Sequence, residues 1–177
     1  MAKVLQALSA YNTDLLKRKP HPRCGQGRFS PGVIRAGVQV NIVPDQCDLE
    51  VDRRTLPGET REEVYEELRE RLEPLVKEDT SFRYVLTEPT WLIPANEVPS
   101  DDFIVRLLLK AHERVVQKPA QVNCFVGGTD APHMGFPAVI CGPGSISQAH
   151  TTQEFVTVEQ LLQAVQIYLW TVLKMLA

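Results

Sequence analysis

The chain has 177 residues, of which 44% are hydrophobic and 23% are charged, and its formal net charge is −3. This composition excludes a disordered chain and supplies enough apolar residues for one large domain or two small ones. The slightly acidic balance argues against a nucleic-acid binder, which would carry a concentrated basic face. The four cysteines form no CxxC pair, which excludes a zinc ribbon and a thioredoxin-like redox motif.

Nothing in the sequence predicts export or membrane insertion. Residues 1–16 alternate polar and apolar side chains at helical spacing, without the uninterrupted apolar run of a signal peptide. The most apolar stretch, residues 161–176, contains polar side chains and is too short to span a bilayer. We therefore expect a soluble, cytoplasmic protein that contacts no membrane.

Helical periodicity predicts two helices in the first half. The first covers about residues 2–17 and lacks an N-terminal cap, because the chain starts directly with the apolar pattern. The second begins after Thr60, which forms a capping box with the glutamate three residues on, and we expect Pro74 to bend or end it. Glu67 and Arg71 are spaced for an ion pair on the solvent-exposed face of this helix.

Two more helices are predicted in the second half. One covers residues 101–117 with Ser100 as its cap, and the other begins after Thr157, which forms a capping box with Gln160. The apolar stripe of this last helix is expected to be buried and consists of Val158, Leu161, Leu162, Val165, Leu169, Val172 and Leu176.

The strand patterns differ between the two halves. Residues 47–52 and 82–86 alternate apolar and polar side chains, as half-exposed antiparallel strands do. Residues 138–141 are continuously apolar, which is typical of a strand covered on both faces, and residues 121–126 are its expected neighbour.

These patterns predict an α/β protein with two parts. We expect residues 1–88 to form an α+β layer with an antiparallel sheet and residues 100–177 to form a piece of a mixed α/β sheet. Residues 89–99 contain three prolines and are predicted to link the two parts.

Two glycine-containing loops in the second half are candidate binding loops. Gly127 and Gly128, followed by Thr129, can turn the backbone sharply and offer N–H groups to an anion, although Asp130 in the same loop is also a plausible cap of a following helix. Residues 142–145 follow an apolar strand, where open α/β sheets place ligands. This second loop matches neither a phosphate-binding P-loop nor the Gly-x-Ser-x-Gly elbow of serine hydrolases.

His150 lies in the loop after the same strand. It can ligate a metal or act as a base, with Glu154 supporting it, or it is simply an exposed loop histidine. His133 with Asp130 is a weaker candidate ligand pair, because their spacing matches no recognised motif. A Cys124–His150 nucleophile pair is conceivable, but nothing in the sequence places the two residues together.

In the first half, Asn41 and Pro44 precede the strand over residues 47–52, and Pro44 predicts an edge or a bulge. Arg54 follows the end of that strand. Its guanidinium fork can receive a substrate carboxylate, or it can form a solvated surface pair with a neighbouring aspartate.

Taken in order, four motifs resemble one family. They are Asn-x-Val-Pro-Asp-x-Cys at residues 41–47, Asp-x-Arg-x-x-Pro-Gly-Glu at 52–59, Gly-Gly-Thr-Asp-Ala-Pro at 127–132 and Gly-Pro-Gly-Ser-Ile-x-Gln-Ala-His-Thr-x-x-Glu-Phe-Val at 142–156. The chain resembles the zinc amidohydrolases and metallopeptidases that include acetylornithine deacetylase, succinyl-diaminopimelate desuccinylase, aminoacylase and glutamate carboxypeptidase. The resemblance covers nearly the whole chain, and its most specific part is the last motif.

The resemblance implies a catalytic α/β domain that is interrupted by a smaller lid domain, through which two copies dimerise. Residues 1–88 would be a truncated lid, 89–99 a linker and 100–177 the C-terminal segment of the catalytic domain. His150 would be the last ligand of a two-zinc site. The substrate-binding residues implied by the resemblance are Asn41, Arg54, Gly128, Thr129, Gly142 and Gly144, of which the last two would shape the pocket next to His150.

The family's other metal ligands and its general-base glutamate belong to an earlier segment that has no counterpart in this sequence. One histidine cannot hold a catalytic zinc ion, which needs about three protein ligands. The resemblance therefore implies the C-terminal portion of a zinc-dependent hydrolase of N-acyl amino acids or small peptides that is inactive alone. The alternatives are a non-catalytic dimerisation or ligand-binding module derived from the family and, with less support, an independent cysteine or serine hydrolase.

Overall fold

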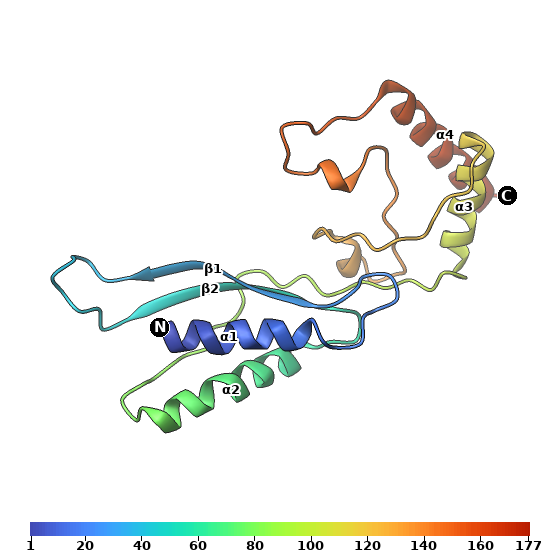
Figure 1. The fold of residues 1–177 in the computed structure, drawn as a ribbon. Helices are drawn as coiled ribbons and strands as arrows, with labels where there is room; N and C mark the ends of the chain where they lie inside the picture. The colour runs from blue at the N-terminus through green and yellow to red at the C-terminus, as the bar shows by residue number, and fades with distance from the viewer. The chain divides into compact units, whose positions relative to one another are not determined.

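The computed structural model describes residues 1–177 and divides into two compact units, Met1–Ala95 and Asn96–Ala177 (Figure 1). The first unit contains helices α1 (Ala2–Leu15) and α2 (Arg61–Glu78) and strands β1 (Arg28–Ala36) and β2 (Cys47–Arg54). The second contains α3 (Phe103–Val116), α4 (Val158–Met175) and the one-turn 3₁₀ helices η1 (Ala131–His133) and η2 (Ile146–Gln148). No helix combines the length and apolarity that crossing a bilayer requires. Because helices occur together with a pair of strands, the predicted α/β class is confirmed.

The two strands form an antiparallel pair, in which Arg28 lies opposite Arg54 at one end and Ala36 opposite Cys47 at the other. The predicted strand at residues 47–52 is confirmed, whereas β1 was missed. The register shifts between Pro31 and Val33, so β1 is bulged. A bulge accommodates a proline and a glycine that a regular central strand would not tolerate, which is why the strand pattern of β1 is weak. Pro44 lies in the connection between the strands.

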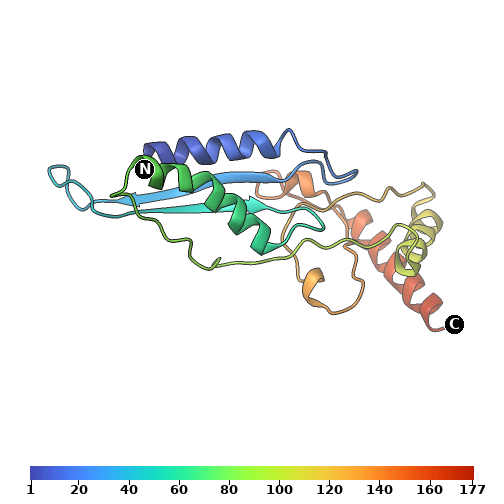
Figure 2. The ribbon, with the colours of Figure 1, turned by 90° about the horizontal axis from the view of Figure 1, so that it is seen from below.

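The core of the first unit lies between α1 and the sheet. Figures 1 and 2 show α1 beside the strands, with α2 next to α1. Because side chains alternate along a strand, one face of the sheet is turned to the helices and the other to solvent. The buried residues of this core are Leu8, Tyr11, Leu15 and Phe29, and Val4, Leu49 and Leu68 pack against them.

Local capping signals predict several helix ends correctly. The Thr60 and Thr157 capping boxes are both present, and α1 begins without a side-chain cap. The predicted cap of α3 is wrong, because Asp102 rather than Ser100 accepts a hydrogen bond from the Ile104 N–H, at 2.9 Å. Pro74 does not end α2, which continues to Glu78. Since the proline lies close to the C-terminus of the helix, its missing N–H removes only one hydrogen bond near that end.

The predicted burial of the α4 stripe is wrong. Leu161, Val165 and Leu169 are 45%, 62% and 58% exposed, whereas Ala164 and Ile167 are buried. Within the second unit α4 packs against α3, and one neighbouring helix covers only a narrow strip of its surface. A wide apolar face of α4 is therefore open in this structure.

Three predicted strands are also wrong. Residues 82–86, 121–126 and 138–141 are extended or irregular and pair with no strand, and the only sheet is the β1–β2 pair. Ile140, expected to be covered on both faces, is 49% exposed. A strand requires a hydrogen-bonding neighbour as well as a suitable sequence, and none is provided for these segments.

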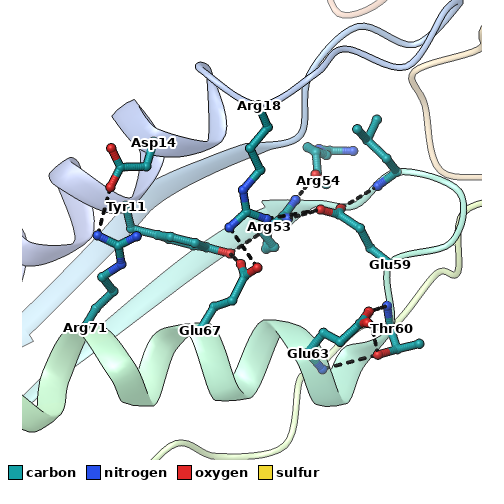
Figure 3. A network of polar contacts seen from close by, with 11 residues as sticks. Tyr11, Asp14, Arg18, Arg53, Arg54, Glu59, Thr60, Glu63, Glu67 and Arg71 are labelled. Atoms are coloured by element: carbon teal, nitrogen blue, oxygen red, sulfur yellow. Dashed lines mark hydrogen bonds and ion pairs between the residues drawn. The ribbon is translucent and has the colours of Figure 1, made fainter.

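A partly buried network of polar side chains joins the elements of the first unit (Figure 3). The Tyr11 hydroxyl donates to Glu67 Oε2 at 2.6 Å and accepts from Arg53 Nε at 3.0 Å. A second nitrogen of Arg53 pairs with Glu59 at 2.7 Å, and a third donates to the carbonyl of Arg54. The network therefore connects α1, the end of β2, the loop that follows it and α2.

The predicted Glu67–Arg71 ion pair is not formed, because each of the two side chains binds a residue outside α2. Arg18 binds Glu67 at 2.8 Å, and Arg71 binds Asp14 at 2.9 Å. Both α2 side chains are turned toward α1, where they find partners from distant parts of the sequence.

Replacing Tyr11 with phenylalanine should destabilise the first unit by about 1–3 kcal/mol, because Arg53 and Glu67 would lose a partner in a buried site. Tyr65→Phe is the matched control, since its hydroxyl donates at the exposed carbonyl of Thr87. Denaturant unfolding of both variants measures the difference. Equal stability of Tyr11→Phe and wild type would contradict the role assigned to the network.

Alkaline pH should weaken the same unit. Burial, together with the hydrogen bond to Glu67, raises the pKa of Tyr11 from 10.0 to about 12. The folded state then holds its proton where the unfolded state releases it, so this contribution is complete below pH 10.0 and is lost as the pH rises to about 12. Unfolding midpoints measured across that interval should fall more steeply for wild type than for Tyr11→Phe. If the unfolding midpoints of wild type and Tyr11→Phe fell equally with pH, the pKa of Tyr11 would not be raised in the folded state.

Candidate functional site

His150 is the best-defined candidate residue of the second unit. Its side chain is exposed, and its backbone has a φ of 63°, in the left-handed region that non-glycine residues seldom occupy. The His150 N–H donates to Glu154 Oε2 at 3.0 Å, and the turn is closed by a hydrogen bond from Thr151 N–H to the Gln148 carbonyl. Residues held in this way are concentrated at functional sites.

Glu154 supports His150 differently from the expected arrangement. The sequence suggested a contact with the imidazole, but the carboxylate binds the backbone N–H of His150. The carboxylate therefore stabilises the unusual backbone conformation and leaves the ring of the histidine exposed. An exposed imidazole on a fixed backbone can act as a ligand for a metal that other residues also bind.

The residues of this chain do not by themselves fit a catalytic zinc ion. Nowhere does the structure gather three His, Cys, Asp or Glu side chains that could hold a metal. Asp130 precedes η1 and His133 is its last residue, and the His133 N–H donates to the Asp130 carbonyl at 2.9 Å, an ordinary turn contact. His150 is thus an isolated candidate ligand.

The two glycine-containing loops lie in the same unit as His150. Thr129 Oγ1 accepts from the Ala131 N–H at 3.4 Å, and Asp130 makes no capping hydrogen bond through its side chain. Gly128 is exposed in this loop. The structure thus gives no support to Asp130 as a side-chain cap.

The second loop is held at its first end by a hydrogen bond from α4. The Tyr168 hydroxyl of α4 donates to the Cys141 carbonyl at 2.7 Å, just before Gly142, and a side chain at Gly142 would come 3.6 Å from that hydroxyl. Gly144 has a φ of 90°, which strongly favours glycine. The loop before His150 therefore has a shape that depends on one of its glycines.

In the first unit, Asn41 and Arg54 lie far apart. Asn41 is exposed in the loop before β2, and Arg54 ends the strand. The eight residues of β2 span about 25 Å at the usual rise of a strand. Figure 1 shows the loop at one end of the strand pair and the end of β2 at the other. The structure does not bring these two predicted substrate-binding residues together.

Arg54 forms the surface pair that was the alternative to carboxylate binding. Its Nε donates to Asp52 Oδ2 at 2.7 Å, and its side chain is 61% exposed. Arg53, which sequence reasoning did not single out, is instead 7% exposed in its side chain and binds Tyr11 and Glu59. The alternation of strand residues could have distinguished the two arginines, because Arg53 shares the inward face with Leu49.

Comparisons with known proteins agree with the resemblance in the motifs. Residues 1–80 match a family model described as a peptidase dimerisation domain. An acetylornithine deacetylase from Yersinia pseudotuberculosis is 35% identical over 160 residues, covering 88% of this chain and 39% of that protein. An N-formyl-4-amino-5-aminomethyl-2-methylpyrimidine deformylase from Bacillus subtilis is 26% identical over 185 residues, covering 96% of this chain and 43% of that protein.

A solved structure shows the same fold. An M20 family metallo-carboxypeptidase from Sulfolobus solfataricus matches with a TM-score of 0.59 at 14% identity, covering 97% of this chain and 44% of that one. This chain spans less than half the length of each of these three proteins. The chain is therefore similar to a C-terminal part of M20 family metallopeptidases, and its residues 1–80 match the dimerisation domain.

Proposed function

We propose that this chain is the C-terminal portion of a zinc-dependent hydrolase that cleaves the amide bond of N-acyl amino acids or small peptides. The observation that carries the proposal is His150, an exposed imidazole on a backbone held in the left-handed region by Glu154. It lies in the sequence motif that most specifically resembles the deacylase branch of the family. The relatives named as a deacetylase and a deformylase support a reaction on an acylated nitrogen.

In this proposal His150 supplies one imidazole to a site for two zinc ions, and the remaining ligands and the general base come from outside these 177 residues. Gly128 and Thr129 contact the substrate through their backbone, and Gly142 and Gly144 shape the pocket beside the histidine. Each of these residues is exposed or half-buried, so each is accessible to a ligand.

The first unit contributes to substrate binding and to assembly. Arg54 receives the substrate carboxylate, and the match to a peptidase dimerisation domain supports a homodimer formed through residues 1–88. Asn41 cannot contact a small substrate bound at Arg54 of the same copy, so its proposed contact is with substrate held elsewhere. The division into a lid, a linker at residues 89–99 and a catalytic segment at 100–177, and a cytoplasmic location, stay predictions.

The alternative is a non-catalytic dimerisation or ligand-binding module. Two observations favour it: the family match over residues 1–80 is to the dimerisation domain, and no cluster of three metal-binding side chains exists in the chain. Such a module would dimerise and bind acylated amino acids without zinc.

Zinc analysis and a deacylase assay test the first proposal. The purified chain should bind zinc substoichiometrically and show no EDTA-sensitive release of acetate from N-acetylornithine. The reason is that a catalytic zinc ion needs about three protein ligands and His150 supplies only one of them. Adding the N-terminal segment of the Yersinia relative should restore zinc binding in wild type and in the His133→Ala control, but not in His150→Ala.

Stoichiometric, EDTA-sensitive activity of the chain alone would contradict its predicted inactivity. Restored activity that is independent of His150 would contradict the role of this residue. An intact zinc-free dimer that binds N-acetylornithine and gains nothing from the added segment would favour the non-catalytic module.

A further inference from the structure

The solvent-facing side of the β1–β2 pair carries an ordered arrangement of charges. The register places Arg28 opposite Arg54, and the alternation of side chains puts both on the face away from α1. Farther along the same face, Arg35 is paired with Glu50. The acidic residues of this face are Asp48, Glu50 and Asp52.

Two of the three arginines on this face are paired with a carboxylate, and the third lies at one end of the sheet. Arg35 has Glu50, and Arg54 has Asp52, while Arg28 is exposed and takes part in no ion pair. Two arginines and one carboxylate therefore meet where Arg28 and Arg54 face each other. Like charges directly opposite in an antiparallel pair destabilise it, so a bound anion would relieve this repulsion.

The backbone that carries these two arginines is fixed from the other face. The guanidinium of Arg53 donates to the Arg54 carbonyl and is itself held by Tyr11 and Glu59, as Figure 3 shows. A Cβ at Gly27, the residue before Arg28, would lie 2.7 Å from Arg53 Nη1 and 3.1 Å from the Arg54 carbonyl oxygen. The strand ends that present Arg28 and Arg54 are therefore packed around one buried, fully engaged side chain.

We propose that Arg28 and Arg54 together bind a single carboxylate group, and that Arg53 is a positioning residue for this site. The inference rests on the proposed role of Arg54 and adds Arg28 as a second determinant of carboxylate recognition. Directly opposite residues have Cβ atoms about 5 Å apart, which lets two long guanidinium side chains converge on one carboxylate. The ligand class is the carboxylate end of an N-acyl amino acid.

The test is an NMR titration of the complete chain with N-acetylglycine, with N-acetylglycinamide as the probe that lacks the charge. Arg28→Gln and Arg54→Gln should each weaken binding of N-acetylglycine about tenfold, the size of one charge-assisted hydrogen bond. The double variant should be little weaker than either one, because both arginines hold the same group. Arg28→Lys should be intermediate, since an ammonium keeps the charge but loses the planar fork.

Arg35→Gln is the matched control, because Arg35 lies on the same face but is already paired with Glu50. It should bind N-acetylglycine as wild type does, and thermal unfolding should confirm that all variants are folded. Gly27→Ala removes no charge but should weaken binding of N-acetylglycine, because the added methyl group would lie too close to Arg53 and shift the strand ends. If the two arginines acted through their charge alone, this substitution would leave binding unchanged.

The outcomes separate this inference from the proposed hydrolase function. Weakened binding in Arg54→Gln with unchanged binding in Arg28→Gln would overturn the two-arginine site and leave the role of Arg54 intact. Equal binding of N-acetylglycinamide, or equally tight binding of inorganic phosphate, would overturn recognition of an acyl amino acid carboxylate. Failure of wild type to bind N-acetylglycine would overturn the site, while the dependence of restored deacylase activity on His150 would be unaffected.

Discussion

The first unit depends on the burial of one charged side chain, Arg53. An unpaired guanidinium in such a position would be strongly destabilising, so its partners must be provided by the fold. Tyr11 of α1, Glu59 of the loop after β2 and the carbonyl of Arg54 provide them. Each partner comes from a different part of the unit, and the arrangement is therefore satisfied only when α1, β2 and the following loop are correctly placed together.

This dependence explains which features could be predicted from sequence. The Thr60 capping box was predictable because its two partners are three residues apart and need nothing else. The Glu67–Arg71 pair has equally good local spacing, yet both side chains bind residues of the α1 region. Local rules describe an isolated helix, and a partly buried partner with fixed geometry outcompetes an exposed pair worth only a few tenths of a kcal/mol.

In the second unit, apolar sequence patterns predicted burial that the structure does not show. The apolar stripe of α4 and the apolar run at residues 138–141 have the composition of buried elements. No strand pairs with the run, however, and α3 is the only helix or strand that packs against α4. Burial is a property of a pair of surfaces, and a sequence pattern specifies only one of them. An open apolar face of this extent is typical of a surface that another protein segment covers, and the chain spans less than half the length of its relatives.

At the candidate site, sequence motifs identified the residues but predicted neither their backbone geometry nor their separation. Residue type and motif order singled out His150, but its left-handed backbone and the binding of Glu154 to its N–H are properties of the turn that no spacing rule specifies. The same holds for Asn41 and Arg54, which belong to adjacent motifs and yet lie at opposite ends of β2. Motifs thus identify which residues are chemically suited to act, whereas the register of the sheet decides which of them can act on the same molecule. By that criterion the residue that Arg54 can act with is Arg28, directly opposite it in the sheet.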